Sequence, residues 1–294
     1  PLAVFTVFAA VNKGQKQLMD LINHGLSDIP QKDILLIEEH WVPDPKLRRY
    51  QELITEFRLT PEEKDWLAKH KHIRLGVNPD WLPVEGIGPN GEYEGLSSSY
   101  TAIIGKMLGV EMKPVEGLTW SQVTEAAKKK DVDVMPSVTI SFNRSTYLSF
   151  TRPYLSFPNV LVTRQDSPMI TGLADMKGKK VAVIRDFAIH EYIESVYPEI
   201  DLLLVDSPAD GLSAVDEEEV AAYVDYLHTA NYYIRKLGLK NLKVAATTDV
   251  ITKISMGVRE DWPELAGILE KALQSLSPRQ QAEIANKWFN VRFK

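Results

Sequence analysis

Short apolar strands and amphipathic helices alternate along this chain from residue 72 onward, and this alternation limits the folds that are open to it. Two predicted strands, NVLVTR (159–164) and KVAVIR (180–185), are almost continuously apolar, as is typical of strands buried on both faces of a sheet. Helices are predicted between the strands, for example over residues 96–108 and 227–237. The alternation favours an α/β fold with mostly parallel sheets flanked by helices.

The composition describes a globular chain and excludes several classes of function. Its 294 residues are 44% hydrophobic and 25% charged, which is long enough for more than one packing unit. The net charge of −6, without a basic stripe, argues against nucleic acid as a partner. Cysteine is absent, which excludes disulfides and thiolate metal sites. No phosphate-binding loop, HExxH or GxSxG motif occurs, so we predict no cofactor, no metal and no catalytic residue.

The first part of the chain resembles its last part at a constant offset. Residues 10–41 align without a gap with residues 257–288, so that Leu18 matches Leu265 and Trp41 matches Trp288. Both segments predict two helices separated by a proline break. Two generic amphipathic helix pairs would also explain the similarity, but the fixed offset favours a repeated module. The opening PLAVFTVFAAV is typical of a domain interior, so we expect an excised piece of a longer protein.

Four stretches of the complete module carry distinctive motifs, namely VNPDWLPVE (77–85), GEYEGLSSSYTAIIGKMLG (91–109), VDVMPSVTISFNRSTYLSFTRPYL (132–155) and LADMKGKKVAVIRD (173–186). Together they resemble the bacterial extracellular solute-binding protein family 3, the periplasmic Venus-flytrap domain. The resemblance implies a bilobed, periplasmic-binding-protein-like α/β fold. Two mostly parallel sheets flanked by helices would be joined by two crossover hinge segments, with a ligand held between the lobes.

The repeated module further resembles the tandem-flytrap sensor histidine kinases of the BvgS type. That resemblance implies a periplasmic ligand-sensing domain of a membrane-bound receptor, which signals by lobe opening or closing. Its partners would be a small polar solute such as an amino acid, a preceding flytrap domain and a membrane helix, with a homodimer as a further option. The resemblance divides the chain into a C-terminal helical remnant of the preceding flytrap (1–42), a helical connector (43–71), the flytrap domain (72–288) and a membrane-proximal tail (289–294). Within the flytrap domain, lobe 1 would comprise about residues 72–155 and 250–288, and lobe 2 about residues 158–246.

Two other functions remain open at this stage. A soluble solute-binding receptor of an amino-acid ABC transporter would have the same fold, although the segment 1–42 argues against it. An enzyme on the same scaffold would need a poised acid or base, and the sequence offers no clear candidate.

Arg144 is the strongest candidate for ligand contact. In the family's amino-acid binders, the arginine at this motif position pairs with the ligand carboxylate, and a guanidinium presents a planar donor fork that suits a carboxylate. The alternative is a surface arginine that caps the next turn. Ser137 and Thr139 alternate along the preceding strand and would offer a hydroxyl pair to the same ligand, unless neighbouring backbone groups bind them.

The resemblance places aromatic residues around the same cleft. Trp81 and Trp120 would line it on lobe 1, although an isolated tryptophan is usually part of a hydrophobic core. Phe187 stands where the family has a small residue and would narrow the cleft. The family's acidic partner for a ligand ammonium falls on Tyr226, with Asp225 one residue earlier, and we predict both as ligand-binding residues although adjacent strand residues face opposite sides.

Overall fold

The computed structural model describes residues 57–289 and, before them, residues 18–19, 21–22, 33, 37 and 40–42. The predictions of a remnant over 1–42, of a connector from residue 43 and of a tail to 294 therefore lie largely outside the described residues. The account below concerns residues 57–276 and 282–289, which belong to one compact unit.

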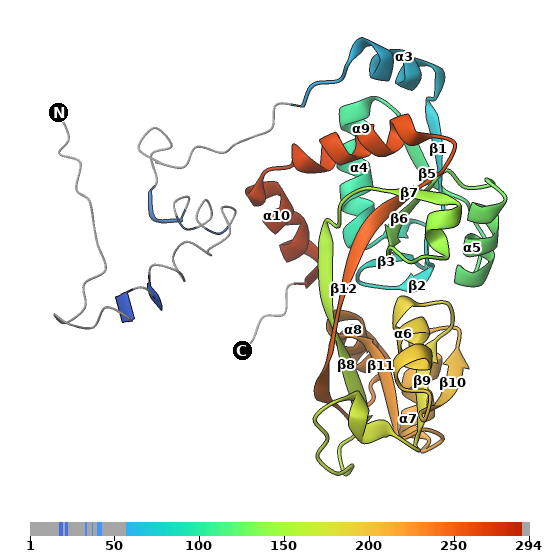
Figure 1. Ribbon diagram of the computed structural model, residues 1–294, viewed down its shortest axis with the longest axis vertical. Helices are drawn as coiled ribbons and strands as arrows, with labels where there is room; N and C mark the ends of the chain where they lie inside the picture. Colours follow the sequence, from blue (N-terminus) through green and yellow to red (C-terminus); the bar gives the residue numbers. More distant parts are fainter. Residues whose placement is uncertain are drawn as a thin grey trace. The chain divides into compact units, whose positions relative to one another are not determined.

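A single path of hydrogen-bonded strands runs through this unit in the order β10-β9-β11-β8-β12-β6-β1-β5, and β7 adds to β12 (Figure 1). In lobe 1, β1 is parallel to β5 and β6, and in lobe 2, β9 is parallel to β10 and β11. The strands are β1 (His72–Leu75), β5 (Glu111–Pro114), β6 (Val134–Val138), β7 (Leu148–Phe150), β8 (Leu155–Arg164), β9 (Lys180–Ile184), β10 (Asp201–Val205), β11 (Ala222–Tyr226) and β12 (Leu242–Arg259).

The long strands β8 and β12 join the two lobes, as Figure 1 shows. They pair antiparallel in lobe 2 up to Thr247↔Val160, and again from Ile251↔Pro158 toward lobe 1, with a register shift between the two stretches. The predicted bilobed α/β fold with two crossover segments is confirmed. β12 is one long strand although polar residues interrupt its apolar pattern, because pairing with β8 keeps the chain extended on both sides of the register shift.

Helices flank both sheets. α4 and α8 have the bounds that the sequence predicts, because each carries an apolar face and ends at a glycine in the left-handed region, Gly109 (φ 65°) and Gly238 (φ 69°). The helices are α3 (Pro61–Lys69), α4 (Leu96–Leu108), α5 (Trp120–Lys128), α6 (Ala188–Val196), α7 (Pro208–Asp216), α8 (Leu227–Leu237), α9 (Pro263–Gln274) and α10 (Pro278–Phe289).

A small antiparallel sheet at the start of lobe 1 was not predicted. It consists of β2 (Asp80–Trp81), β3 (Glu85–Ile87) and β4 (Tyr93–Glu94), which are too short to show an alternating pattern. Gly95 links this sheet directly to α4 with a φ of 103°, and a Cβ there would lie 2.6 Å from the Cα of Glu85. Only glycine fits this turn, which places Trp81 beside the start of α4.

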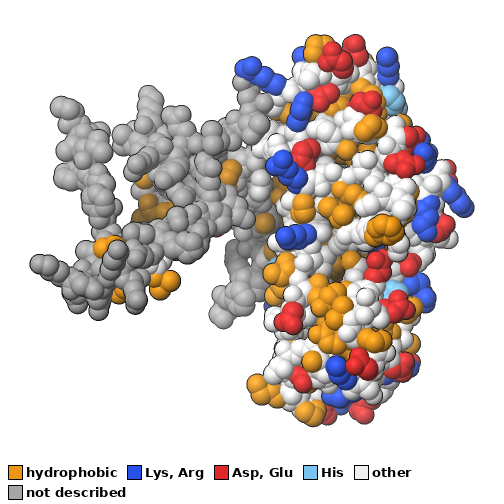
Figure 2. Space-filling model, viewed as in Figure 1, with side chains coloured by type: hydrophobic (Ala, Val, Ile, Leu, Met, Phe, Trp, Pro, Cys, Tyr) orange, Lys and Arg blue, Asp and Glu red, His pale blue; other side chains and the backbone are white. Residues whose placement is uncertain are grey.

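Apolar residues form a continuous core under the sheets of both lobes. Representative members with almost no exposed surface are Ile73, Leu75, Ile104, Val134, Leu265 and Ile268 in lobe 1, and Val181, Val183, Ile193, Leu212 and Val224 in lobe 2. On the face drawn in Figure 2, acidic and basic side chains are interspersed. Among the described residues, no helix is both long and apolar enough to cross a membrane.

Candidate ligand cleft

Seven of the eight predicted site residues converge between the lobes. They surround a residual cavity of about 10 Å³ together with three apolar residues that the sequence did not single out, Val138, Ala188 and Ile254. The predicted residues in this lining are Trp81, Trp120, Ser137, Thr139, Arg144, Phe187 and Tyr226. A cavity of this size holds about one water molecule, so the side chains themselves fill the cleft.

Asp225 is the exception, and its prediction as a cleft residue needs correction. It precedes Tyr226 on β11, and successive side chains of a strand point to opposite faces. Tyr226 therefore lines the cleft, whereas the buried carboxyl group of Asp225 accepts hydrogen bonds from the Tyr223 hydroxyl (2.7 Å) and from the Tyr226 backbone N–H (2.7 Å). Burial raises the pKa of Asp225 to about 7.

Arg144 connects the two lobes. It begins a short 3₁₀ helix (Arg144–Thr146) and is only 5% exposed. Its Nη2 donates to the backbone carbonyl of Asp186 in lobe 2 at 2.6 Å, and its Nη1 donates to the carbonyl of Thr139 at 3.2 Å and to the Thr139 hydroxyl. Among residues 57–289, no carboxylate forms an ion pair with it. A buried cation that contacts only neutral acceptors is unfavourable, so an anion reaching this position would be strongly favoured.

The turn that carries Asp186 forms the lobe 2 side of the site, although the predicted ligand-binding residues include only Phe187 from it. It connects β9 to α6, and Asp186 adopts a φ of 61°, which aspartate tolerates better than most residues. Its carboxylate accepts a hydrogen bond from the Ser121 hydroxyl of lobe 1 at 3.0 Å. The next residue, Phe187, occupies the N-cap position of α6 without a side-chain cap, so the first N–H groups of this helix lie beside the cleft.

Phe187 closes the cleft with other aromatic rings. Its ring centroid lies 5.5 Å from that of Trp81, 6.0 Å from Tyr226 and 6.1 Å from Trp120. The indole N–H groups of Trp81 and Trp120 are buried without an acceptor in the described part of the chain. The expectation that Phe187 would narrow the cleft agrees with this packing, and a solute larger than water needs Phe187 to move or the lobes to part.

Ser137 belongs to a buried polar network behind the cleft. Its hydroxyl group shares a hydrogen bond with Ser97, which lies 3.3 Å from the Tyr154 hydroxyl. The fully buried Glu85 nearby accepts from the Asn78 backbone N–H at 2.9 Å, and burial raises its pKa to about 8. Sequence reasoning missed Glu85, although an acidic residue that ends the otherwise apolar run WLPVE (81–85) was a usable signal.

No group of three or more histidine and carboxylate side chains able to hold a metal ion occurs within the described residues. The donors gathered at the cleft are instead a guanidinium, two indole N–H groups and a helix N-terminus. This set suits an oxygen-rich anion, and aromatic faces stand beside it for an apolar part of the same ligand.

Comparison with known proteins points to the same kind of protein. The chain is 24% identical over 227 residues to the virulence sensor protein BvgS of Bordetella pertussis, and 23% identical over 288 residues to the sensor protein EvgS of Escherichia coli K12. These matches cover 77% and 97% of this chain, but it spans only about a fifth of either protein (18% and 23%). It is also 24% identical to the ABC transporter arginine-binding protein 1 of Escherichia coli K12, with 74% of this chain and 90% of that protein covered.

Solved structures show the same fold. The crystal structure of a histidine kinase sensor domain with similarity to periplasmic binding proteins superimposes with a TM-score of 0.69 at 30% identity, over 75% of this chain and 97% of that one. The periplasmic VFT2 domain of Bordetella pertussis BvgS gives 0.72 at 24% identity, over 79% and 99%. Residues 73–291 match the profile of one protein family. The chain belongs to the bacterial extracellular solute-binding proteins, family 3.

Proposed function

We propose that this chain is the periplasmic ligand-sensing part of a membrane-bound sensor histidine kinase, and that it signals by opening and closing its two lobes. Catalysis would reside elsewhere in the full-length protein, and this fragment binds. The match to EvgS supports this assignment, because it extends over 97% of the chain and so includes residues ahead of the flytrap domain. The segments 1–42 and 43–71 fit a remnant of a preceding flytrap and a connector.

The ligand that we propose is a small carboxylate such as an amino acid. The observation that carries this proposal is Arg144, a buried cation in the cleft whose described acceptors are all neutral. A ligand carboxylate would replace the Asp186 carbonyl on the guanidinium and would gain donors from the start of α6. Because Asp225 faces away from the cleft, recognition of an ammonium group would contribute less than recognition of the carboxylate.

Signalling would follow from contacts that exist only when the lobes are closed. These are the hydrogen bond from Arg144 to Asp186, the hydrogen bond from the Tyr233 hydroxyl to the Asp80 carbonyl at 3.0 Å, and the packing of Trp81 on Phe187. A ligand shifts the balance between open and closed forms only by binding one of them more tightly. A solute that displaces Phe187 would therefore change the spacing of the lobes and bias the output.

Calorimetry with amino acids and their C-terminal amides tests the proposal. The unmodified protein should prefer the acid over the matching amide, and Arg144→Gln should lose this preference through a roughly 10- to 100-fold weaker binding of the acid. The comparison between acid and amide separates carboxylate recognition from any effect of the substitution on lobe closure. Arg152→Gln, which alters an exposed arginine of the same lobe, is the matched control and should bind like the unmodified protein. The same preference for the acid in the Arg144 variant would refute the carboxylate model.

A transport receptor is the second candidate. Its support is the coverage of 90% of the arginine-binding protein, which is far more than the share covered of either sensor protein. That match, however, leaves a quarter of this chain without a counterpart. Solute uptake that depends on this protein in living cells, without any change in gene expression, would favour transport over sensing.

A further inference from the structure

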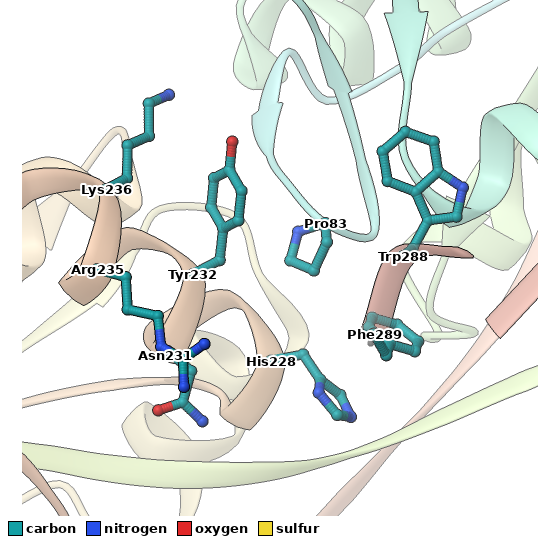
Figure 3. A pocket seen from close by; sticks show the side chains of 8 residues that line it. All are labelled: Pro83, His228, Asn231, Tyr232, Arg235, Lys236, Trp288 and Phe289. Carbon is teal, nitrogen blue, oxygen red and sulfur yellow. The ribbon is translucent and has the colours of Figure 1, made fainter. Parts of the chain in front are cut away.

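A second cavity lies outside the cleft and shares no lining residue with it. Its volume is about 430 Å³, which is within the range of small-molecule sites. Both lobes contribute to it: Pro83 lies in the turn between β2 and β3, Trp288 and Phe289 end α10, and the remaining lining residues come from α8 of lobe 2. Figure 3 shows Tyr232 and Arg235 on one side, Trp288 and Phe289 on the other, and Pro83 between them.

The helical repeat of α8 explains why one lobe supplies most of the polar lining. His228, Tyr232 and Arg235 follow one another at intervals of four and three residues and so lie on one face of the helix. The opposite face, which contains Ala230 and Tyr233, is buried, and the Tyr233 hydroxyl reaches the Asp80 carbonyl of lobe 1. The cavity therefore receives a cation and two ring systems from a single rigid element.

The cations of this cavity are available for a ligand. Neither Arg235 nor Lys236 forms an ion pair within residues 57–289, and both are exposed. The Lys236 ammonium lies 5.7 Å from the ring centroid of Tyr232. Burial, and after it the charge of the nearby Glu94, raise the pKa of Tyr232. Glu94 does not line the cavity, so the balance of charge on the lining remains positive.

The opposite wall is aromatic. The ring of Phe289 stacks on His228 with centroids 4.2 Å apart and planes inclined by 20°. Burial lowers the pKa of His228, so this ring is predominantly neutral at pH 7 and stacks as an aromatic group. Trp288 lies next to this pair and donates a hydrogen bond from its Nε1 to the Ser99 hydroxyl at 2.9 Å. The cavity thus combines flat apolar surface with free positive charge.

From these contacts we propose that the cavity is a second ligand site, which takes a small organic anion with a flat aromatic ring. The ring would lie against Trp288 and Phe289, and the anionic group would face Arg235. This proposal goes beyond the sensing function of the cleft and does not depend on it, because the two cavities have no residue in common.

The site would also connect the end of α10 to both lobes. Trp288 is hydrogen-bonded to Ser99 of α4 in lobe 1. Phe289 contacts α8 of lobe 2, and its ring centroid lies 5.8 Å from that of Phe157 on the crossover strand β8. A ligand bound between these residues would change the position of the last turn of α10 relative to the two lobes, without entering the cleft.

Nuclear magnetic resonance of the Trp288 indole N–H, assigned with a Trp288→Phe variant, tests the proposal. Benzoate and phenyl phosphate are the probes, and benzyl alcohol is the neutral control. We expect both anions to shift this signal in a saturable way with a dissociation constant of about 1 mM or lower. Arg235→Gln should weaken their binding roughly tenfold, whereas Arg185→Gln, an exposed arginine elsewhere in lobe 2, should leave it unchanged.

The readout keeps the two proposals apart, because Trp288 lines this cavity and not the cleft. Failure of carboxylate binding in the cleft therefore leaves this test unaffected. The absence of a saturable shift with either anion would overturn the second site. So would equal binding of benzyl alcohol or unchanged affinity in Arg235→Gln.

Discussion

At the scale of single residues, a difference of one position decides between a cleft residue and a core residue. Tyr226 faces the ligand cleft, and Asp225 on the other side of the strand fixes Tyr223 and the start of α8. The motif that carries Arg144 and Trp81 made their place in the cleft predictable from the sequence. Which of Asp225 and Tyr226 faces the cleft was not predictable, because adjacent strand residues point to opposite faces and the sequence does not say which face borders the cleft.

The buried carboxyl group of Asp225 makes stability depend on pH. Its pKa of about 7 in the folded protein lies above the ordinary value of 3.8, so the folded state binds the proton more tightly than the unfolded state. The resulting stability is complete below about pH 4 and is lost as the pH rises through about 7. Asp225→Asn removes this pH-dependent contribution to the free energy of unfolding and keeps an acceptor for the Tyr226 backbone N–H.

We therefore expect the stability of Asp225→Asn relative to the unmodified protein to increase from pH 4 to pH 7, by at most about 1.4 kcal/mol per pH unit, and to level off above. Urea denaturation at several pH values measures the difference. A difference that does not change with pH would contradict the assignment.

At the scale of elements, amphipathic helices were predictable and the short or interrupted strands were not. α4 and α8 carry their own apolar face and glycine stop, so local sequence is sufficient to define them. β2, β3 and β4 have two or three residues each and depend on the tight approach at Gly95. β12 is extended through its polar middle because β8 pairs with it, which is a tertiary effect that periodicity does not record.

Asn159 ties the two crossover strands together where their register shifts. It is completely buried, and its Nδ2 donates to the Val250 carbonyl at 2.9 Å and to the Thr252 hydroxyl at 2.8 Å. Asn159→Ala would remove this donor from the buried Thr252 hydroxyl and from the carbonyl of the half-buried Val250. We expect a loss of about 2–3 kcal/mol in the free energy of unfolding.

Chemical denaturation measures this loss, and hydrogen exchange of residues 247–252 should speed up more than that of the lobes. The exposed Asn241, replaced by alanine, is the matched control and should cost less than about 0.5 kcal/mol. An equal loss in the free energy of unfolding for both substitutions would show that the hydrogen bonds of Asn159 do not hold β8 and β12 together.

At the scale of the whole flytrap unit, aromatic packing in the cleft competes with ligand binding for the same space. The residual cavity of about 10 Å³ means that the closed arrangement is stabilised by the protein's own side chains. Truncating Phe187 removes its contacts with Trp81 and Trp120 across the cleft, and its contact with Tyr226 in its own lobe. The balance between closed and open lobes should then move toward the open form.

Small-angle X-ray scattering of Phe187→Ala should accordingly give a larger radius of gyration than that of the unmodified protein. Phe142→Ala is the control, because this phenylalanine of lobe 1 is 88% exposed. An unchanged radius in the Phe187 variant would mean that the hydrogen bonds of Arg144 and Tyr233 alone keep the lobes closed.

The continuity of β8 and β12 has a consequence for how the unit folds. Both strands supply backbone pairs to the sheet of each lobe, so neither lobe has a complete set of strands of its own. The two lobes, which we propose to move apart in function, should therefore fold together and melt in a single transition. A destabilising substitution in lobe 2 would lower the resistance of lobe 1 to unfolding by the same amount.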